Sequence, residues 1–212
     1  MTIARSISLV AAIILMTTAT ARAISPQDII DNVQEKYESV TDATVLFVQS
    51  VSFKVSRAEQ TSSGKLYFKK KNQYRIETDT RTVVTDGKTS WSYNPQNKQV
   101  IIDDFKEESH SMAPDKLLLT FPEDHYVSLV GEETLDGEDC YVLKLTPKDE
   151  NSFTTGMKIW VNDDWVIKRV EVTDINGATT TYTIKKITFN TGIQASTFHF
   201  EAPPGTDEID LR

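Results

Sequence analysis

The chain has 212 residues, of which 31 are acidic and 23 are basic, so its formal net charge is −8 at pH 7. This acidic balance argues against binding to nucleic acid and against adsorption to anionic lipid. The length suffices for one domain with a sizeable core. Because no internal repeat and no linker rich in proline, glycine or serine divides the sequence, we expect a single domain.

The N-terminal segment has the pattern of a cleavable signal peptide. Arg5 supplies a positive charge, Leu9 to Met16 form an uninterrupted apolar run, and Ala21-Arg22-Ala23 is a small-x-small cleavage site. The run is shorter than the roughly 20 apolar residues that cross a bilayer. We therefore expect residues 1–23 to be removed and residues 24–212 to form the mature domain. Loss of Arg5 and Arg22 gives this domain a net charge of −10.

The chain has one cysteine, Cys140, which lies far from the signal peptide in a strand-like stretch. A bacterial lipid anchor would require a cysteine directly after the apolar segment, where Ala23 and Ile24 stand instead. A single cysteine closes no intramolecular disulfide and is typical of a small core residue. We expect a mature protein that is freely soluble, without a lipid anchor or a disulfide.

One amphipathic helix is predicted at the start of the mature chain. Ser25 is a typical N-cap residue, and Pro26 suits the first helical position. Asp28 is placed to complete a capping box with Ser25. Apolar residues then recur at helical spacing over roughly four turns. They are Ile29, Ile30, Val33, Tyr37 and Val40. This apolar face must lie on another part of the protein.

After this helix, apolar residues alternate in steps of two, which is typical of β-strands. A long first strand places Val45, Phe47, Gln49, Val51, Phe53 and Val55 on one face. Further strands are expected at Lys65–Lys70, Gln73–Thr78, Thr82–Thr85, Thr89–Tyr93, Gln99–Ile102, Tyr126–Val130, Asp139–Leu145, Gly156–Val161, Val166–Val172 and Thr179–Phe189. Turn signals such as Asp86-Gly87 and Asn176-Gly177 separate them. Short strands joined by tight turns predict an antiparallel sheet.

A short apolar helix is expected between two prolines, over Pro114–Pro122. Its position in a long connection between strands allows two interpretations. It fills the core, or it lies beside the first helix as part of a lid over an open sheet.

No constellation typical of an enzyme occurs in the sequence. The histidines His110, His125 and His199 are scattered, and none has a partner at a metal-ligand spacing. There is no nucleophile elbow and no glycine-rich phosphate loop. We therefore expect a protein without enzymatic activity, catalytic residues, metal or cofactor.

Large apolar side chains instead share faces of the predicted strands. Residues two apart on one strand share a face, and the sets are Leu66 with Phe68, Tyr74 with Ile76, Trp91 with Tyr93, and Met157 with Ile159 and Val161. A curved antiparallel sheet lined with such residues either fills its interior or leaves an apolar cavity. Periodicity alone does not distinguish these two outcomes.

The stretch from Val84 to Pro95, VTDGKTSWSYNP, resembles the D-G-K-x-x-W-x-Y-N-P signature of the periplasmic outer-membrane lipoprotein carrier proteins, the LolA family. Other landmarks agree in order and spacing. Phe47-Val48-Gln49 is similar to the family's F-x-Q, residues 64–70 (GKLYFKK) to its G-x-L-x-x-K-R, residues 143–147 (LKLTP) to its L-T-P, and residues 198–205 (FHFEAPPG) to its F-x-F-x-x-P-x-G. The resemblance covers essentially the whole mature chain.

The resemblance implies a half-open antiparallel β-barrel of about eleven strands, with helices covering its concave face and a cavity for the acyl chains of a lipoprotein. Such a carrier is a periplasmic monomer. It accepts acylated lipoproteins from an inner-membrane ABC lipoprotein-release complex and hands them to an outer-membrane lipoprotein receptor. Enclosure is physically required, because acyl chains exposed to water cost on the order of 0.8 kcal/mol per methylene.

The resemblance also suggests which residues act in binding. The cavity is expected to be lined by Phe47, Leu66, Phe68, Tyr74, Ile76, Trp91, Tyr93, Met157 and Ile159. Lid contacts are expected from Ile29, Ile30, Val33, Leu118 and Phe121.

The chain departs from the family pattern at the end of the second strand. Lys70 stands where an arginine is usual, and Lys71 replaces a proline. The resemblance places Lys70 at the cavity rim, where the family arginine helps hold or release the lid, but lysine lacks the planar fork of arginine. The alternative interpretation is a solvated lysine run.

An alternative function uses the same scaffold. A regulatory protein of the periplasm could sense mislocalised lipoproteins and dock on a membrane-bound signalling partner. Such sensors tend to carry an additional C-terminal domain, whereas this sequence ends soon after its last predicted strand.

Overall fold

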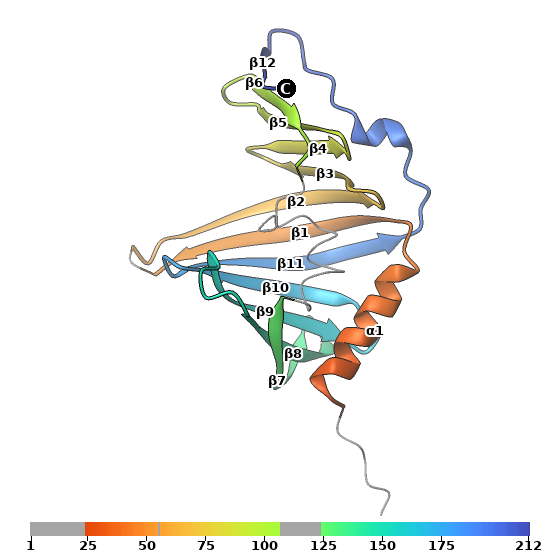
Figure 1. The fold of residues 1–212 in the computed structure, drawn as a ribbon, viewed down its shortest axis with the longest axis vertical. Coiled ribbons are helices and arrows are strands. Elements are labelled where there is room, and N and C mark those ends of the chain that lie inside the picture. The colour runs from red at the N-terminus through yellow and green to blue at the C-terminus, as the bar shows by residue number, and fades with distance from the viewer. Residues whose placement is uncertain (1–23, 55, 107–123) are drawn as a thin grey trace, which may run out of the picture.

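The computed structural model describes residues 24–54, 56–106 and 124–212, and these form one strongly curved sheet with a single α-helix (Figure 1). The elements in chain order are α1 (Pro26–Glu38), β1 (Asp42–Phe53), β2 (Glu59–Lys69), β3 (Gln73–Thr78), β4 (Thr82–Asp86), β5 (Thr89–Asn94), β6 (Gln99–Asp104), β7 (His125–Leu135), β8 (Glu138–Pro147), β9 (Thr154–Asn162), β10 (Ile167–Asp174), β11 (Ala178–Phe189), the 3₁₀ helix η2 (Ala195–Phe198) and β12 (Asp207–Asp210). None of the described helices is long and apolar enough to cross a membrane.

The helix α1 begins as its sequence predicts. The Ser25 side chain accepts a hydrogen bond from the Asp28 backbone N–H at 3.1 Å, and the Asp28 carboxylate accepts one from the Ser25 N–H at 3.0 Å. This capping box and Pro26 in the first turn confirm the predicted start of the helix. The helix ends at Glu38, and Ser39 is its C-cap.

The twelve strands lie in the order β12-β6-β5-β4-β3-β2-β1-β11-β10-β9-β8-β7. Every neighbouring pair is antiparallel except β12 and β6, which are parallel. The predicted antiparallel, mainly β architecture is thereby confirmed. The first and last strands of this order, β12 and β7, are not paired with each other in the described residues, so the sheet is not closed into a barrel.

Several details differ from the expected fold, among them the extension of β7 to Leu135, five residues past its predicted end. There are twelve strands rather than about eleven, because Asp207–Asp210 adds a short parallel edge strand that shows no long alternating pattern. The second strand begins at Glu59, six residues earlier than predicted, since its polar start has no apolar alternation. Only α1 covers the sheet among the described residues, and the expected helix over Pro114–Pro122, with Leu118 and Phe121, lies outside them.

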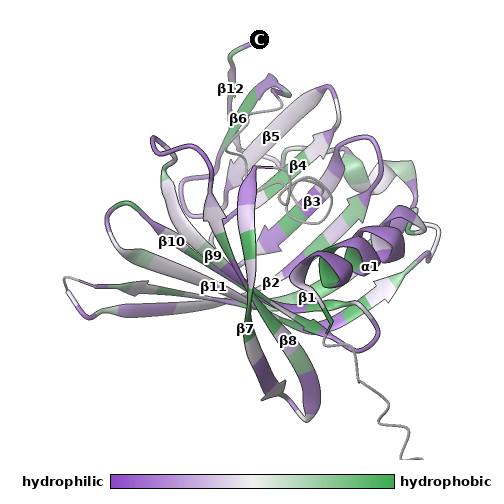
Figure 2. Ribbon diagram, turned by 60° about the horizontal axis from the view of Figure 1, so that its bottom comes forward, coloured by the Kyte–Doolittle hydropathy of each residue, from purple (hydrophilic) through white to green (hydrophobic). Residues whose placement is uncertain are grey.

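We call the face of the sheet that carries Ala43, Val45 and Phe47 the inner face. Residues of α1, β1, β2, β8, β9 and β10 meet there in the main hydrophobic core. The core thus joins α1 to strands from both halves of the sheet. Figure 2 shows the alternation of hydrophobic and hydrophilic residues along the strands, which gives the sheet its two different faces.

A second hydrophobic cluster lies on the opposite, outer face. It contains Val84, Trp91, Val100 and Ile102, with the partly buried Tyr93, Phe200 and Ala202 packed against it. The segment between β11 and β12 therefore runs over the outer side of β4 to β6, and its η2 turn contacts β3 and β4. Figure 1 shows this segment leaving the end of β11 and passing along the sheet to β12.

Candidate functional site

The strand register places one row of mostly apolar side chains across the inner face of β1 to β6. Directly opposed residues share a face of a sheet. The row is Val45, Leu66, Ile76, Val83, Ser92 and Ile101. Leu66, Ile76 and Val83 are half-buried and Ile101 is 39% exposed. The part of the inner face that continues past the main core is thus apolar but incompletely covered by the described residues.

Phe47 lies in the middle of the inner face, above a glycine. Phe47 pairs with Gly64 on β2, and a Cβ added at Gly64 would overlap the Phe47 ring. The same ring makes an edge contact with Tyr182, with the ring centroids 6.0 Å apart. The glycine therefore lets a large aromatic side chain lie flat against the sheet. The phenylalanine of the F-x-Q landmark and the glycine of the G-x-L landmark thus depend on each other.

The inner face carries little charge. In β1 to β5, β9 and β10, charged side chains in the regularly paired parts of the strands occupy outer-face positions, among them Lys65, Arg75, Glu77, Lys158 and Glu171. Two ion pairs form among them, between Arg75 and Glu77 at 2.6 Å and between Lys158 and Glu171 at 3.5 Å. Nearer the edges of the sheet, Asp103 on β6 and Glu132 on β7 are at inner-face positions. The central part of the inner face suits an uncharged, apolar ligand, because the strands there offer no fixed charge that binding would desolvate.

The residues predicted to line a cavity divide between the two faces. Phe47, Leu66, Phe68, Tyr74, Ile76, Met157 and Ile159 lie on the inner face. Trp91 and Tyr93 lie on the outer face, because Trp91 opposes Val84, which in turn opposes Arg75. Alternation correctly predicts that Trp91 and Tyr93 share a face, but it leaves open which face that is.

The two outer-face aromatics pack under the C-terminal segment. The Trp91 and His199 rings are 5.3 Å apart at nearly right angles, and the Tyr93 and Phe200 rings are 5.3 Å apart. Trp91 is only 8% exposed. The landmarks at residues 84–95 and 198–205 thus pack against each other. The Trp91 side chain is buried by residues of the protein itself.

Some inner-face residues belong to the packed core rather than to an open surface. Phe68, Met157 and Ile159 are buried together with α1. The predicted lid residues Ile29, Ile30 and Val33 are at most 1% exposed. A movement of α1 away from the sheet would expose all three at a cost of about 1.5–3 kcal/mol each.

Lys70 connects the end of β2 to the end of α1. Its Nζ donates a hydrogen bond to the Glu38 carbonyl oxygen at 2.5 Å. A cation at a helix C-terminus interacts favourably with the unpaired carbonyl groups there. Lys70 is exposed, so this contact lies at the margin of the core.

The two residues after Lys70 form a tight turn in the left-handed region. Lys71 has φ 73° and Asn72 has φ 59°. Proline cannot adopt a positive φ, so the proline of the family pattern is incompatible with this turn. A Cβ at Gly87, whose φ is 90°, would lie 2.6 Å from the Lys71 carbonyl oxygen. The Asp86-Gly87 turn therefore packs closely against the departing segment.

Asp42 anchors the start of β1 to the segment after β11. Its carboxylate accepts hydrogen bonds from the Thr191 N–H at 2.8 Å, the Thr191 hydroxyl at 3.1 Å and the Gly192 N–H at 3.0 Å. Burial acts to raise the pKa of Asp42, but these hydrogen bonds to the ionised form outweigh it and hold the pKa below its usual value. The carboxylate is structural.

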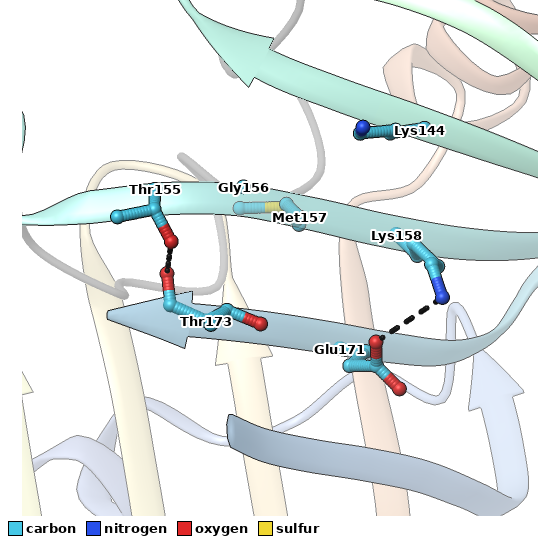
Figure 3. A pocket seen from close by; sticks show the side chains of 7 residues that line it. All are labelled: Lys144, Thr155, Gly156, Met157, Lys158, Glu171 and Thr173. Carbon is cyan, nitrogen blue, oxygen red and sulfur yellow. Dashed lines mark hydrogen bonds and ion pairs between the residues drawn. The ribbon is translucent and has the colours of Figure 1, made fainter. Parts of the chain in front are cut away.

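A half-open pocket lies where β8, β9 and β10 adjoin (Figure 3). Its empty volume is about 450 Å³, which includes open solvent. It is lined by Lys144, Thr155, Gly156, Met157, Lys158, Glu171 and Thr173. Lys158 is engaged with Glu171, and the Thr155 hydroxyl donates to the Thr173 carbonyl oxygen at 3.1 Å. This mixed, charged lining differs from the apolar inner face and does not extend it.

No cluster of metal-ligating side chains occurs among the described residues. The lone Cys140 is buried on the outer face with Val142 and Trp160, and burial raises the pKa of its thiol. A thiol with a raised pKa is a poor nucleophile. The described part of the chain thus presents an apolar surface and packing contacts, and its arrangement suits binding.

Sequence reasoning missed several inner-face residues. Val83 was not singled out because Val84 follows it directly, and two adjacent valines leave the alternation ambiguous. Tyr182 and Ile184 lie in a threonine-rich strand with little apolar contrast, yet they face inward beside Gln49 and Phe47. The register of β1 with β11 was the missing information.

Comparison with known proteins agrees with this fold. A family model described as outer membrane lipoprotein carrier protein LolA matches residues 38–201. An outer-membrane lipoprotein carrier protein of Histophilus somni is 26% identical over 186 residues, which cover 86% of this chain and 88% of that protein.

Two further matches carry names that state no activity. An uncharacterized protein of Methanocaldococcus jannaschii is 31% identical over 188 residues, which are 86% of this chain and 53% of the relative, so the chain spans about half of that protein's length. The crystal structure of an uncharacterized conserved protein from Thermus thermophilus has a TM-score of 0.57 at 14% identity, covering 87% of this chain and 98% of that chain. This last likeness concerns the fold.

Proposed function

The chain belongs to the outer membrane lipoprotein carrier family, LolA, and on that premise we propose that it binds the acyl chains of lipoproteins on the inner face of its sheet and carries them through the periplasm. The observation that carries the proposal is the half-buried apolar row of Leu66, Ile76 and Val83, which the described residues cover only in part. Such a surface lowers the free energy of acyl chains that would otherwise contact water.

The proposal assigns a different role to each part of the predicted cavity set. Leu66, Tyr74 and Ile76, together with Phe47, contact the acyl chains. Phe68, Met157 and Ile159 support that surface from the core beneath α1. Trp91 and Tyr93 hold the C-terminal segment on the outer face. Binding is non-covalent and requires no catalytic group.

The route of the cargo follows the family. Residues 1–23 direct export and are removed, so that residues 24–212 act in the periplasm. An inner-membrane ABC complex supplies the lipoprotein, and an outer-membrane receptor accepts it. Lys70 keeps the end of α1 attached at the rim through Glu38.

A release assay tests the carrier role. Purified mature protein is incubated with spheroplasts, and we expect outer-membrane lipoproteins to appear in the soluble fraction as one-to-one complexes. Leu66→Glu places a charge on the inner face and is expected to abolish release. Tyr67→Glu changes the adjacent, half-buried outer-face residue of the same strand and serves as the matched control.

Two outcomes would contradict the carrier role. One is a folded wild-type protein that releases no lipoprotein. The other is equal release by the Leu66→Glu variant, with its fold verified by circular dichroism. Binding of lipoprotein without release, together with docking on a membrane signalling protein, would instead support the regulatory alternative.

A further inference from the structure

A short row of uncharged polar side chains adjoins the apolar part of the inner face. Gln49 on β1 opposes Ser62 on β2 and Tyr182 on β11, so the three side chains lie side by side on one face. Directly opposed residues have Cβ atoms about 4.5–5.5 Å apart. All three are half-buried. We refer to Ser62, Gln49 and Tyr182 as the polar row.

The polar row has hydrogen-bonding capacity that the fold does not use. Within the described part of the chain, no hydrogen bond involves the side chains of Gln49 or Ser62 or the Tyr182 hydroxyl. Neighbouring polar residues off this row are paired, since Ser50 donates to Glu59 at 2.6 Å and Thr78 donates to the Arg81 carbonyl oxygen at 3.0 Å. The burial of Tyr182 raises the pKa of its phenol, which therefore stays protonated.

The row continues directly into the apolar core. From Tyr182 the same register leads to Val170, Ile159 and Leu143. On β1 the next inner-face position beside Gln49 is Phe47, which the strand spacing puts roughly 6.6 Å away. A ligand on the inner face would thus meet apolar side chains along its length and three hydrogen-bond donors at one place.

From this placement we infer that the polar row is the subsite for the carbonyl groups that join acyl chains to the head of the ligand, with Gln49, Ser62 and Tyr182 as donors. An amide N–H₂ and two hydroxyl groups match uncharged carbonyl acceptors. A charged headgroup finds no opposite charge in this row. The inference rests on the proposed function and names the chemistry that distinguishes a lipid ester or amide from a plain hydrocarbon.

Paired probes test the inference. One probe is a dioctanoylglyceryl-cysteine peptide, and the other is its dioctyl ether analogue, which lacks both ester carbonyls. By isothermal titration calorimetry we expect the wild-type mature protein to bind the ester probe about tenfold more tightly, the effect of one or two net hydrogen bonds. An N-octanoyl peptide with an ether-linked glyceryl group reports on the amide carbonyl separately.

Substitutions in the polar row test whether its donors cause the preference for the ester probe over the ether probe. Gln49→Leu and Tyr182→Phe should each reduce the preference for the ester probe, whatever they do to the affinity for the ether probe. Ser62→Ala should act in the same direction, whereas Ser63→Ala, on the outer face one residue away, is the matched control. An unchanged preference in Gln49→Leu and Tyr182→Phe would overturn the subsite.

The same titrations separate this inference from the proposed function. Equal affinities of the wild-type protein for ester and ether probes would refute the subsite while leaving acyl binding in place. Failure of folded wild-type protein to bind either probe would refute both.

Discussion

Tyr93 and Phe200 pack against each other on the outer face, with ring centroids 5.3 Å apart and planes tilted by 37°. Tyr93 belongs to the D-G-K-x-x-W-x-Y-N-P landmark and Phe200 to the C-terminal F-x-F landmark. With Trp91 and His199 beside them, these residues hold the segment after β11 across β4 to β6. The most specific sequence signature thus maintains the architecture around the inner face.

Because Trp91 lies on the outer face, we expect its substitution to lower stability without changing the affinity for acyl chains. Trp91→Phe should lower the free energy of unfolding by about 1–3 kcal/mol, because Trp91 is 8% exposed within the outer cluster. The folded fraction should bind the dioctanoyl peptide with wild-type affinity. Leu66→Ala, on the inner face, should weaken that binding. Urea titration and calorimetry measure the two effects, and a shared loss of affinity would argue against outer-face packing of Trp91.

The contact between Phe47 and Gly64 predicts a specific intolerance. Gly64→Ala places a Cβ into the Phe47 ring and should destabilise the protein by about 1–3 kcal/mol, as overpacking does. The same change should cost less in a Phe47→Leu background, because the smaller side chain leaves room. Denaturant unfolding of the four proteins forms a double-mutant cycle. Additive costs would show that the ring does not restrain position 64.

The turn at Lys71 predicts opposite effects of glycine and proline. Lys71 has φ 73°, so Lys71→Gly should stabilise the fold modestly, because relief of the left-handed conformation (roughly 1–2 kcal/mol) outweighs the added unfolded-state entropy of glycine (about 0.4–1 kcal/mol). Lys71→Pro should destabilise it strongly, since proline cannot take this angle. Lys88→Gly is the control, because Lys88 is exposed and its φ is not positive. Thermal unfolding ranks the variants, and a tolerated proline would contradict the turn geometry.

The hydrogen bond from Lys70 to the Glu38 carbonyl oxygen predicts a charge requirement at the end of α1. Lys70→Ala should cost about 0.3–1 kcal/mol, the range of exposed cation interactions at a helix C-terminus. Lys70→Arg should retain most of this stability, while Lys70→Gln should lose much of it. Urea midpoints at low and high salt measure the effect. Lys106→Ala, an exposed lysine with only a 3.8 Å pairing to Asp103, is the control.

Because the Tyr37 phenol is buried, we expect the protein to lose stability at alkaline pH. Burial raises the pKa of Tyr37 to about 12, despite the opposing hydrogen bond from the Ile167 N–H. Because the folded state favours the neutral phenol, its contribution is fully present below the unfolded pKa of about 10 and is lost as the pH rises toward 12. Tyr37→Phe should therefore flatten the stability profile between these values.

The control for this effect is Tyr126→Phe, because the Tyr126 side chain is 67% exposed. Urea unfolding at several pH values measures both variants. Profiles of equal slope for wild-type and Tyr37→Phe proteins would show that Tyr37 ionises as readily in the folded state as in the unfolded state.

The sequence alone determined the local elements. The capping box and apolar spacing at Ser25 to Tyr37 define α1, since both depend on residues within a few positions of each other. Alternation and turn residues located the body of eleven strands for the same reason. The polar β12 gave no such signal and forms only by pairing with β6.

The tertiary structure decided which side of the sheet each residue faces. Alternation states that Trp91 and Tyr93 share a face, but a sheet has two faces, and only the register from β2 through β5 puts these aromatics outside and Leu66 inside. The partners of Gln49 and Lys70 were undetermined for the same reason, because they come from distant parts of the chain. The family signature thus identified the fold, whereas long-range pairing separated its packing residues from the face proposed to bind.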